Sequence, residues 1–259
     1  MKVCELYDFL ENRIPKSLSC EWDNDGLMCC PDREKEVRRV LVALDVTSAT
    51  VEYAVENGYD VIISHHPFIY KGLRSVDDLG YVSSKLISLI ESGISVMSFH
   101  TRLDAVSGGV NDRLCELLDI RDAEPLYEEG IPLGRVGTLE STVSSQELAL
   151  KVKSALGSPF VLLSGSKEDI TRVAVVGGSG KDMVEAARAA GADALVSGRL
   201  DYHPMTDAFD FNERNITLIE AGHFYTENPV CDKIKKFLAD KFDGLETEIF
   251  DTKSPYVTY

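Results

Sequence analysis

Residues 39–64 read RVLVALDVTSATVEYAVENGYDVIIS, and residues 172–197 repeat the pattern without a gap as RVAVVGGSGKDMVEAARAAGADALVS. Nine of the twenty-six aligned positions are identical. Each copy indicates a strand, a helix and a second strand, because a β-branched run precedes a segment that ends at a glycine, Gly58 or Gly191. Strands joined by a crossover helix most often pair in parallel. The repeat therefore predicts an α/β protein with two similar α/β domains.

Two adjacent histidines, His65 and His66, lie just after the strand expected at residues 61–63. Pro67 then prevents continuation, because proline lacks an N–H and disfavours helix at the residue before it. Ligands of open α/β sheets bind at the carboxyl ends of the strands, so two imidazoles there favour a metal site. Two hydrogen-bonded loop histidines are the alternative, since a lone His-His pair is a weak motif.

A further strand in each half, at residues 94–99 and 216–220, leads into a His-x-x-x-carboxylate motif. The two motifs are His100 with Asp104 and His223 with Glu227. If the segment after each strand is helical, this spacing places both side chains on one helix face, close enough to share an ion. Two such motifs in similar places, together with the histidine pair, favour a metal site over a chance arrangement.

Five blocks of the chain resemble the signature of the Nif-three-like family, whose members are often labelled GTP cyclohydrolase I type 2 homologues. The blocks are WDNDGL at 22–27, SHHP at 64–67, HTRLD at 100–104, SGRLDYH at 197–203 and GHFYTE at 222–227. The match spans most of the chain in the right order. One position departs from it, because Arg102 stands where the family often has asparagine.

The resemblance implies a centre of two divalent metal ions per chain. It assigns His65, His66, Asp104 and His223 as ligands and places either Glu227 alone or both Glu227 and Asp104 between the ions. His100 is either a ligand or a residue beside the ligands. The resemblance also implies that Asp23 and Asn24 orient ligands, and that six subunits form a ring.

The donor types independently restrict the metal. Imidazole nitrogen and carboxylate oxygen without thiolate suit zinc, iron, manganese or nickel, and they argue against a cysteine-rich structural zinc site. Two such ions lower the pKa of bound water and clamp the reacting atoms, which favours hydrolysis. The same donors can equally store or relay metal without catalysis.

Other residues near these motifs are candidates for substrate contacts. Lys71 and Arg74, just past the histidine pair, are expected to bind an anionic, nucleotide-like small molecule, with exposed loop cations as the alternative. His100 and His203 are the expected proton carriers, although a structural role for His203 is nearly as well supported. Trp22, the only tryptophan, is expected to be buried.

The glycine-rich stretch 177–181 follows a strand and opens a helix. Its amides could hold an anion, but Val175 stands where a P-loop has its first glycine. A tight strand-to-helix turn is the favoured interpretation.

Composition limits the partners of the protein. The 259 residues are 44% hydrophobic and carry a formal net charge of −16, which argues against a nucleic-acid partner because that binding depends on lysine and arginine. No window approaches a membrane span, and the N-terminus lacks a signal-like apolar stretch. The six cysteines lack Cys-x-x-Cys spacing and are expected to be reduced. These features predict a cytoplasmic protein with no membrane partner.

Residues 122–134, rich in proline, glycine and acid, are expected to link the two domains. We therefore expect a first domain at residues 1–125 and 220–259 and a second at residues 126–219, with the metal site in the cleft between them. A dinuclear metal-dependent hydrolase is the favoured function. The alternatives are a non-catalytic metal-binding or metal-delivery protein and a ring-shaped interaction scaffold.

Overall fold

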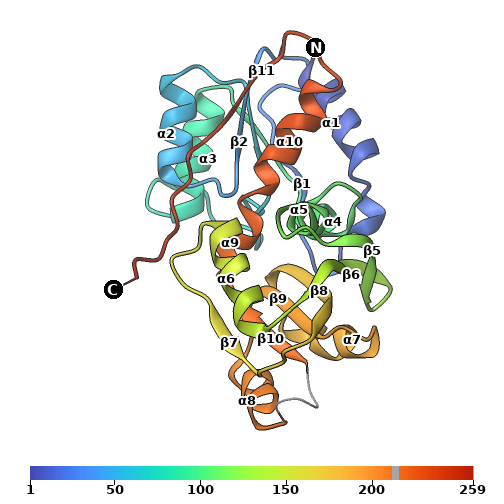
Figure 1. Ribbon diagram of the computed structural model, residues 1–259. Helices are drawn as coiled ribbons and strands as arrows, with labels where there is room; N and C mark the ends of the chain where they lie inside the picture. The colour runs from blue at the N-terminus through green and yellow to red at the C-terminus, as the bar shows by residue number, and fades with distance from the viewer. Residues whose placement is uncertain (212–215, 259) are drawn as a thin grey trace. The chain divides into compact units, whose positions relative to one another are not determined.

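The computed structural model describes residues 1–211 and 216–258 and shows a mixed α/β fold with two sheets (Figure 1). The chain forms two compact units. Unit 1 comprises Met1–Val106 and Val230–Lys253, and unit 2 comprises Ser107–Pro229 and the end of the chain from Ser254. These limits differ from the domain boundaries expected after residues 125 and 219, and the domain assignment stays a prediction.

Unit 1 contains one five-stranded sheet and the helices that cover it. Its elements are α1 (Val3–Arg13), the 3-10 turn η1 (Lys16–Leu18), β1 (Gly26–Cys29), β2 (Arg39–Ala43), α2 (Ser48–Glu56), β3 (Val61–Ser64), α3 (Tyr81–Glu91), β4 (Ser95–Ser98), α4 (Thr101–Ala105), α10 (Val230–Ala239) and β11 (Glu246–Ile249). The strand order is β1-β4-β3-β2-β11. The strands β2, β3, β4 and β11 are parallel, and β1 pairs with β4 in the antiparallel direction.

Apolar alternation explains how this sheet is covered. Leu41, Ile62 and Val96 lie in one buried cluster with Val51 of α2 and Leu89 of α3. Successive side chains of a strand point to opposite faces, so the remaining apolar residues of β2 and β3 are buried on the other face. Figure 1 shows α2 and α3 along one face of the sheet and α10 along the other.

The register of unit 1 brings two chain segments to one edge of the sheet. Ser64 at the end of β3 pairs with both Ala43 and Ser98. The chain therefore leaves β3 at His65 and leaves β4 just before His100, both at the carboxyl edge. This is the edge at which the sequence predicts ligands to bind.

Unit 2 contains a six-stranded sheet. Its elements are α5 (Val110–Leu117), β5 (Arg121–Glu128), β6 (Ile131–Val143), α6 (Ser145–Leu156), β7 (Leu162–Ser164), β8 (Ile170–Ser179), the 3-10 turn η2 (Lys181–Met183), α7 (Val184–Ala189), β9 (Ala194–Arg199), α8 (Tyr202–Phe211), β10 (Thr217–Glu220) and α9 (His223–Glu227). The strand order is β5-β6-β8-β9-β10-β7. The strands β8, β9 and β10 are parallel, and β7 pairs with β10 in the antiparallel direction.

Each face of the second sheet has its own core. Val173 and Val175 of β8 pack with Leu148 and Val152 of α6. The alternate residues of β8, including Ala174, belong to a second cluster that contains parts of α7 and α8. Residues 122–134, expected to be a linker, instead form most of the antiparallel hairpin β5–β6.

In the described ranges, we find no helix with the length and apolar character that crossing a membrane requires. All six cysteines lie in these ranges and are free thiols.

Candidate metal centre

His65 and His66 are held at the carboxyl edge of the first sheet by main-chain and side-chain contacts. The amide of His66 donates to the Leu44 carbonyl at 3.0 Å, which extends the β2–β3 pairing past the last strand residue. His65 is fully buried, and its Nδ1 lies 3.0 Å from the Phe99 carbonyl oxygen. His66 Nδ1 lies 2.8 Å from Asp45 Oδ1.

His100 caps the N-terminus of α4 and is oriented by Asp23. Its Nδ1 lies 2.9 Å from Asp23 Oδ1, while Asp23 Oδ2 accepts hydrogen bonds from the backbone N–H and the hydroxyl of Thr101. Burial acts to raise the pKa of Asp23, but the hydrogen bond and positive charge of His100 and the Thr101 contacts outweigh it and lower the pKa to about 2. Asp23 is thus a fixed carboxylate, as the resemblance implies for an orienting residue.

The three imidazoles form one cluster within unit 1. One ring nitrogen from each of His65, His66 and His100 lies within 4.8 Å of the other two. All three Nδ1 atoms contact a carboxylate or a carbonyl, which is how metal-binding histidines are typically oriented through the nitrogen that does not bind the ion. The cluster thus has both the donor type and the orientation of a metal site, and its residues fit a divalent ion.

Asp104 belongs to the same group of side chains. Its Oδ1 lies 3.8 Å from His65 Nε2, and α4 carries it. Asp23 is the carboxylate that contacts His100, and Asp104 lies beside His65. His100 is the N-cap residue of α4 and Asp104 lies within that helix, so His65 is a neighbour of both.

The second motif behaves as expected. His223 and Glu227 lie on α9, and His223 Nε2 is 2.8 Å from Glu227 Oε2. The Glu227 side chain is only 5% exposed. Unit 2 therefore presents an imidazole and a buried carboxylate side by side, and this pair can also bind a metal.

The glycines at the end of β8 are explained by their contact with α9. Gly178 has φ +63°, and a Cβ there would lie 2.1 Å from Glu227 Oε1. A Cβ on Gly198 would lie 2.5 Å from the Thr226 hydroxyl oxygen. The Gly178 amide donates to that hydroxyl at 3.1 Å. These glycines therefore form an irregular end of β8 that lets α9 approach the backbone. The turn that the sequence favours over residues 177–181 is narrower than expected, because the strand continues to Ser179 and η2 begins at Lys181.

Arg102, at the position where the resemblance implies asparagine, carries a fully buried guanidinium. Its Nε lies 3.0 Å from Asp25 Oδ2, and a terminal nitrogen lies 2.7 Å from Glu11 Oε1. Asp25 also accepts from the His100 amide at 3.2 Å. The substitution therefore adds an ion-pair network beneath the loop that carries His100.

The remaining predicted residues lie on exposed parts of the chain. Lys71 and Arg74 are exposed in the segment between β3 and α3, and His203 is exposed on α8. Trp22 was expected to be buried, but it is 62% exposed. The turn-forming residues after it keep the loop at the surface and leave the indole in solvent.

Sequence reasoning missed Asp45 as a partner of His66. Asp45 follows β2 at the same sheet edge as His66. The rule that ligands gather at the carboxyl ends of parallel strands, applied to this strand too, would have identified it.

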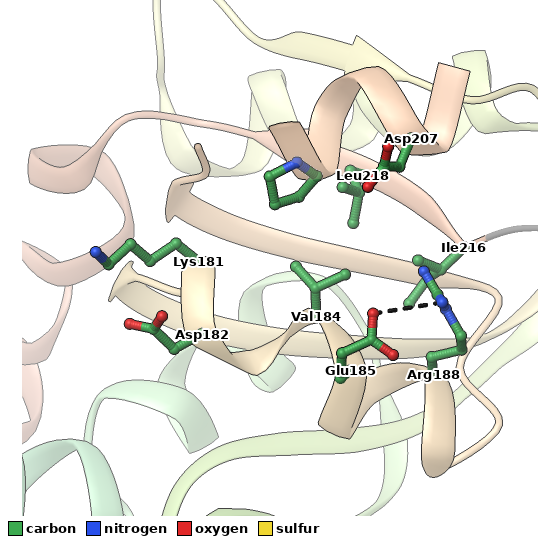
Figure 2. Close-up of a pocket in the computed structure, with 9 residues that line it drawn as sticks. Lys181, Asp182, Val184, Glu185, Arg188, Asp207, Ile216 and Leu218 are labelled. Atoms are coloured by element: carbon green, nitrogen blue, oxygen red, sulfur yellow. Dashed lines mark ion pairs between the residues drawn. The ribbon is translucent and has the colours of Figure 1, made fainter. Parts of the chain in front are cut away.

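Unit 2 also contains a pocket of about 280 Å³ whose described lining includes none of the candidate metal ligands. Figure 2 shows Glu185 and Arg188 of α7 paired along one side of it, 3.3 Å apart, with Lys181 directed away from that pair. Its described lining includes neither His223 nor Glu227. Because its charges are largely paired, this pocket does not resemble a site for an anionic substrate.

Comparison with known proteins agrees with these features. The Duf34/NIF3 (NGG1p interacting factor 3) family model matches residues 1–255. A Clostridium perfringens protein named GTP cyclohydrolase 1 type 2 homolog is 33% identical over 250 residues, which cover 94% of each chain.

Solved structures are similar over nearly the whole chain. Reduced HcgD from Methanocaldococcus jannaschii matches with a TM-score of 0.84 and 30% identity, covering 97% of this chain and 98% of its own. A Bacillus cereus protein related to NIF3 matches with a TM-score of 0.88 at 22% identity, covering 100% and 99%, which shows the shared fold. With the signature blocks, the fold and the family match all in agreement, the chain belongs to the Duf34/NIF3 family.

Proposed function

We propose that the protein is a cytoplasmic, dinuclear metal-dependent hydrolase of a small anionic or nucleotide-like substrate. The observation that carries the proposal is the cluster of His65, His66 and His100, in which each imidazole is oriented through Nδ1. Family membership supports it, since the relatives carry the name GTP cyclohydrolase 1 type 2 homolog.

The proposed ligands come from both units. In unit 1 they are His65, His66 and Asp104, and in unit 2 they are His223 and Glu227, with Glu227 shared between two ions. This set supplies only nitrogen and oxygen donors, which suit zinc, iron, manganese or nickel. When bound, two such ions would acidify a water molecule and stabilise the charge that develops during hydrolysis.

Residues around the ligands are assigned to proton transfer and substrate binding. His100 is the first candidate proton carrier, because the buried carboxylate of Asp23 orients its ring. His203 is the second candidate. Lys71 and Arg74 are proposed to bind the anionic group of the substrate.

We further infer that the two units are copies of one ancestral fold with a shared metal site in the cleft. Both sheets contain three adjacent parallel strands, which are β2, β3 and β4 in the first sheet and β8, β9 and β10 in the second. The last strand of each set also pairs with an antiparallel strand from earlier in the chain: β1 pairs with β4, and β7 pairs with β10. Asp60 and Asp193, aligned by the repeat, make matching contacts. Each accepts two successive backbone N–H groups at the start of its own sheet's first parallel strand.

Elemental analysis of freshly purified protein tests the metal assignment. We expect close to two divalent ions per chain, and reconstitution with zinc, manganese or iron(II) should restore them after removal. Fewer than one ion per chain under all these conditions would contradict the proposal.

The shared-carboxylate assignment has its own test. Glu227→Ala should lose more metal than His100→Ala, because a carboxylate between two ions holds both, whereas His100 is assigned to proton transfer. Equal metal loss in the two variants would make His100 a ligand and would remove the special role of Glu227.

Metal delivery is the alternative function. Retention of the ions distinguishes a metal-delivery protein from a metal-dependent hydrolase. A catalytic centre should keep its metal against a moderate chelator near neutral pH and should hydrolyse a phosphoester, cyclic amide or nucleotide in a screen. His65→Ala or Asp104→Ala should abolish that activity. A carrier should release metal readily as imidazoles protonate below about pH 6.5, and should hydrolyse none of the compounds.

A further inference from the structure

The rim of the three-histidine cluster carries two exposed aromatic rings. Trp22 is 62% exposed and Tyr70 is 49% exposed. The Trp22 ring centroid lies 6.2 Å from that of His100 at an interplanar angle of 76°, and the Tyr70 centroid lies 6.5 Å from it at 83°. Two large side chains from separate loops thus leave apolar surface in solvent next to the same imidazole.

The Trp22 loop is anchored on both sides of the indole. Before it, the Cys20 amide donates to the Thr101 hydroxyl at 3.0 Å. After it, Asp23 binds His100, and the Asn24 side chain donates to the Ile69 carbonyl. The last contact also joins this loop to the one that carries Tyr70. The loops that carry the exposed rings are therefore anchored before any ligand arrives, which lowers the entropy of loop ordering lost on binding.

Two cations follow Tyr70 on its loop. Lys71 and Arg74 are exposed, and neither forms an ion pair with a residue in the described ranges. In a chain with a formal net charge of −16, these two cations come directly after an exposed aromatic residue, and the nearest acidic residues in the same segment are Asp77 and Asp78. Aromatic rings stack on planar bases, and lysine and arginine bind phosphate.

We propose that Trp22 and Tyr70 form a subsite that binds the planar heteroaromatic ring of a nucleoside monophosphate, while Lys71 and Arg74 bind its phosphate. This inference rests on the proposed function, in which the neighbouring histidines belong to the metal centre. Binding of the heteroaromatic ring does not itself require turnover. It assigns a role to the exposed tryptophan, which the metal chemistry leaves unexplained.

The single tryptophan of the chain provides the readout. AMP or GMP should quench Trp22 fluorescence to saturation in both metal-free and metal-loaded protein. Ribose 5-phosphate, which has the phosphate but no base, should not do so at the same concentrations. Tyr70→Leu should raise the Kd for AMP at least tenfold in this assay, and Trp22→Leu should do the same by calorimetry.

Matched variants distinguish loss of this subsite from a non-specific effect of removing an exposed aromatic ring or a charge. Tyr127→Leu replaces a tyrosine of similar exposure, 56%, on β5 of unit 2, and it should leave the Kd unchanged. The double variant Lys71→Ala/Arg74→Ala should weaken AMP binding at least tenfold but leave adenosine binding unchanged.

Three results would overturn the inference. They are the absence of quenching by both nucleotides, equal binding of ribose 5-phosphate and AMP, and Trp22 emission that follows protein concentration instead of nucleotide. The last would assign the aromatic pair to contact with a second copy of the chain. Nucleotide binding without hydrolysis would support the subsite while contradicting the hydrolase, so the two failures are distinguishable.

Discussion

At the residue scale, the position of Glu227 depends on the absence of a side chain at Gly178. The Glu227 carboxylate occupies the space that a Cβ on Gly178 would need, at 2.1 Å, and the left-handed φ of +63° disfavours other residues as well. A buried carboxylate has little freedom to move aside. The proposed ligand Glu227 can therefore keep its position only if residue 178 has no Cβ.

We expect Gly178→Ala to lower metal affinity at least tenfold, because the new methyl group displaces Glu227. The control is Gly191→Ala, which has a similar φ of +72° but nothing within 4 Å of its Cβ. Both variants should lose about 1–2 kcal/mol of stability from backbone strain, measured by denaturant unfolding. If the two variants bind metal equally well, Gly178 does not position Glu227.

The sequence predicts the candidate ligands better than it predicts their partners. His65 and His66 were identifiable because a β-branched run and Pro67 mark the end of a strand. The aspartates that orient His66 and His100 lie 21 and 77 residues away from them, and no local periodicity connects such pairs. The exposure of Trp22 was predicted wrongly, because the turn-forming residues after it keep its loop at the surface.

At the element scale, one aspartate in each sheet fixes the start of a parallel strand. Asp60 accepts the backbone N–H groups of Arg38 and Arg39 at 2.9 and 3.1 Å, and Lys35 pairs with it at 3.0 Å. Burial acts to raise the pKa of Asp60, but the contacts from Arg38, Lys35 and Arg39 lower it below 3.8.

Asp193 makes the corresponding contacts in the second sheet. It accepts the N–H groups of Thr171 and Arg172, and it pairs with Lys167 at 3.0 Å. Burial acts to raise its pKa, but the bonds from Arg172, Thr171 and Lys167 lower it below 3.8. A lowered folded pKa means that the stabilisation is complete above about pH 4 and is lost as the pH falls through the folded value.

Asp60→Asn and Asp193→Asn should each lower the free energy of unfolding by about 1.5–3 kcal/mol at neutral pH, since each carboxylate accepts several hydrogen bonds. Each variant should also lose less stability than the parent protein when the pH is lowered below about 4. Denaturant titrations across pH measure both effects. Asp78→Asn, in an exposed loop, is the control and should change neither; an equal effect there would remove the special role of the two aspartates.

The central strands of the sheets could be predicted from the sequence, but the exposed hairpin β5–β6 at the edge of the second sheet could not. The apolar runs predict strands at residues 40–44, 61–63 and 194–196, and β2, β3 and β9 lie within three residues of these limits, because buried parallel strands are continuous apolar runs. The hairpin β5–β6 was mistaken for a linker. Seven of the eight residues of β5 are exposed or half-buried, so the strand lacks the apolar alternation by which strands are recognised.

At the scale of the whole molecule, apolar side chains are exposed on one segment of unit 1. Between β3 and α3, Leu79 is 91% exposed and Val76 is 56% exposed, and Tyr81 at the start of α3 is 69% exposed. Apolar surface gathered in this way commonly marks a protein contact. This segment is therefore the first candidate for contact between subunits of the ring that the family resemblance implies.

We expect light scattering to give a mass of several times 28.6 kDa, consistent with a homohexamer. Leu79→Asp should shift the mass towards smaller species, because it places a charge in the proposed contact. The parent protein would contradict this prediction if it remained a monodisperse monomer at micromolar concentration.

The path of the chain also affects how the protein is made. Unit 2 is contiguous up to Pro229, apart from the few residues at the end of the chain, whereas unit 1 resumes at Val230 and needs α10 and the edge strand β11. On the ribosome, the later half of the chain thus has nearly all its residues before the earlier half is complete. Domains usually fold with the N-terminal one first, but here the unit that contains the N-terminus is completed last. Until β11 emerges and pairs with β2, the nascent chain carries an open sheet edge, and this interval is when it is most exposed to chaperones and to mispairing with a neighbouring copy.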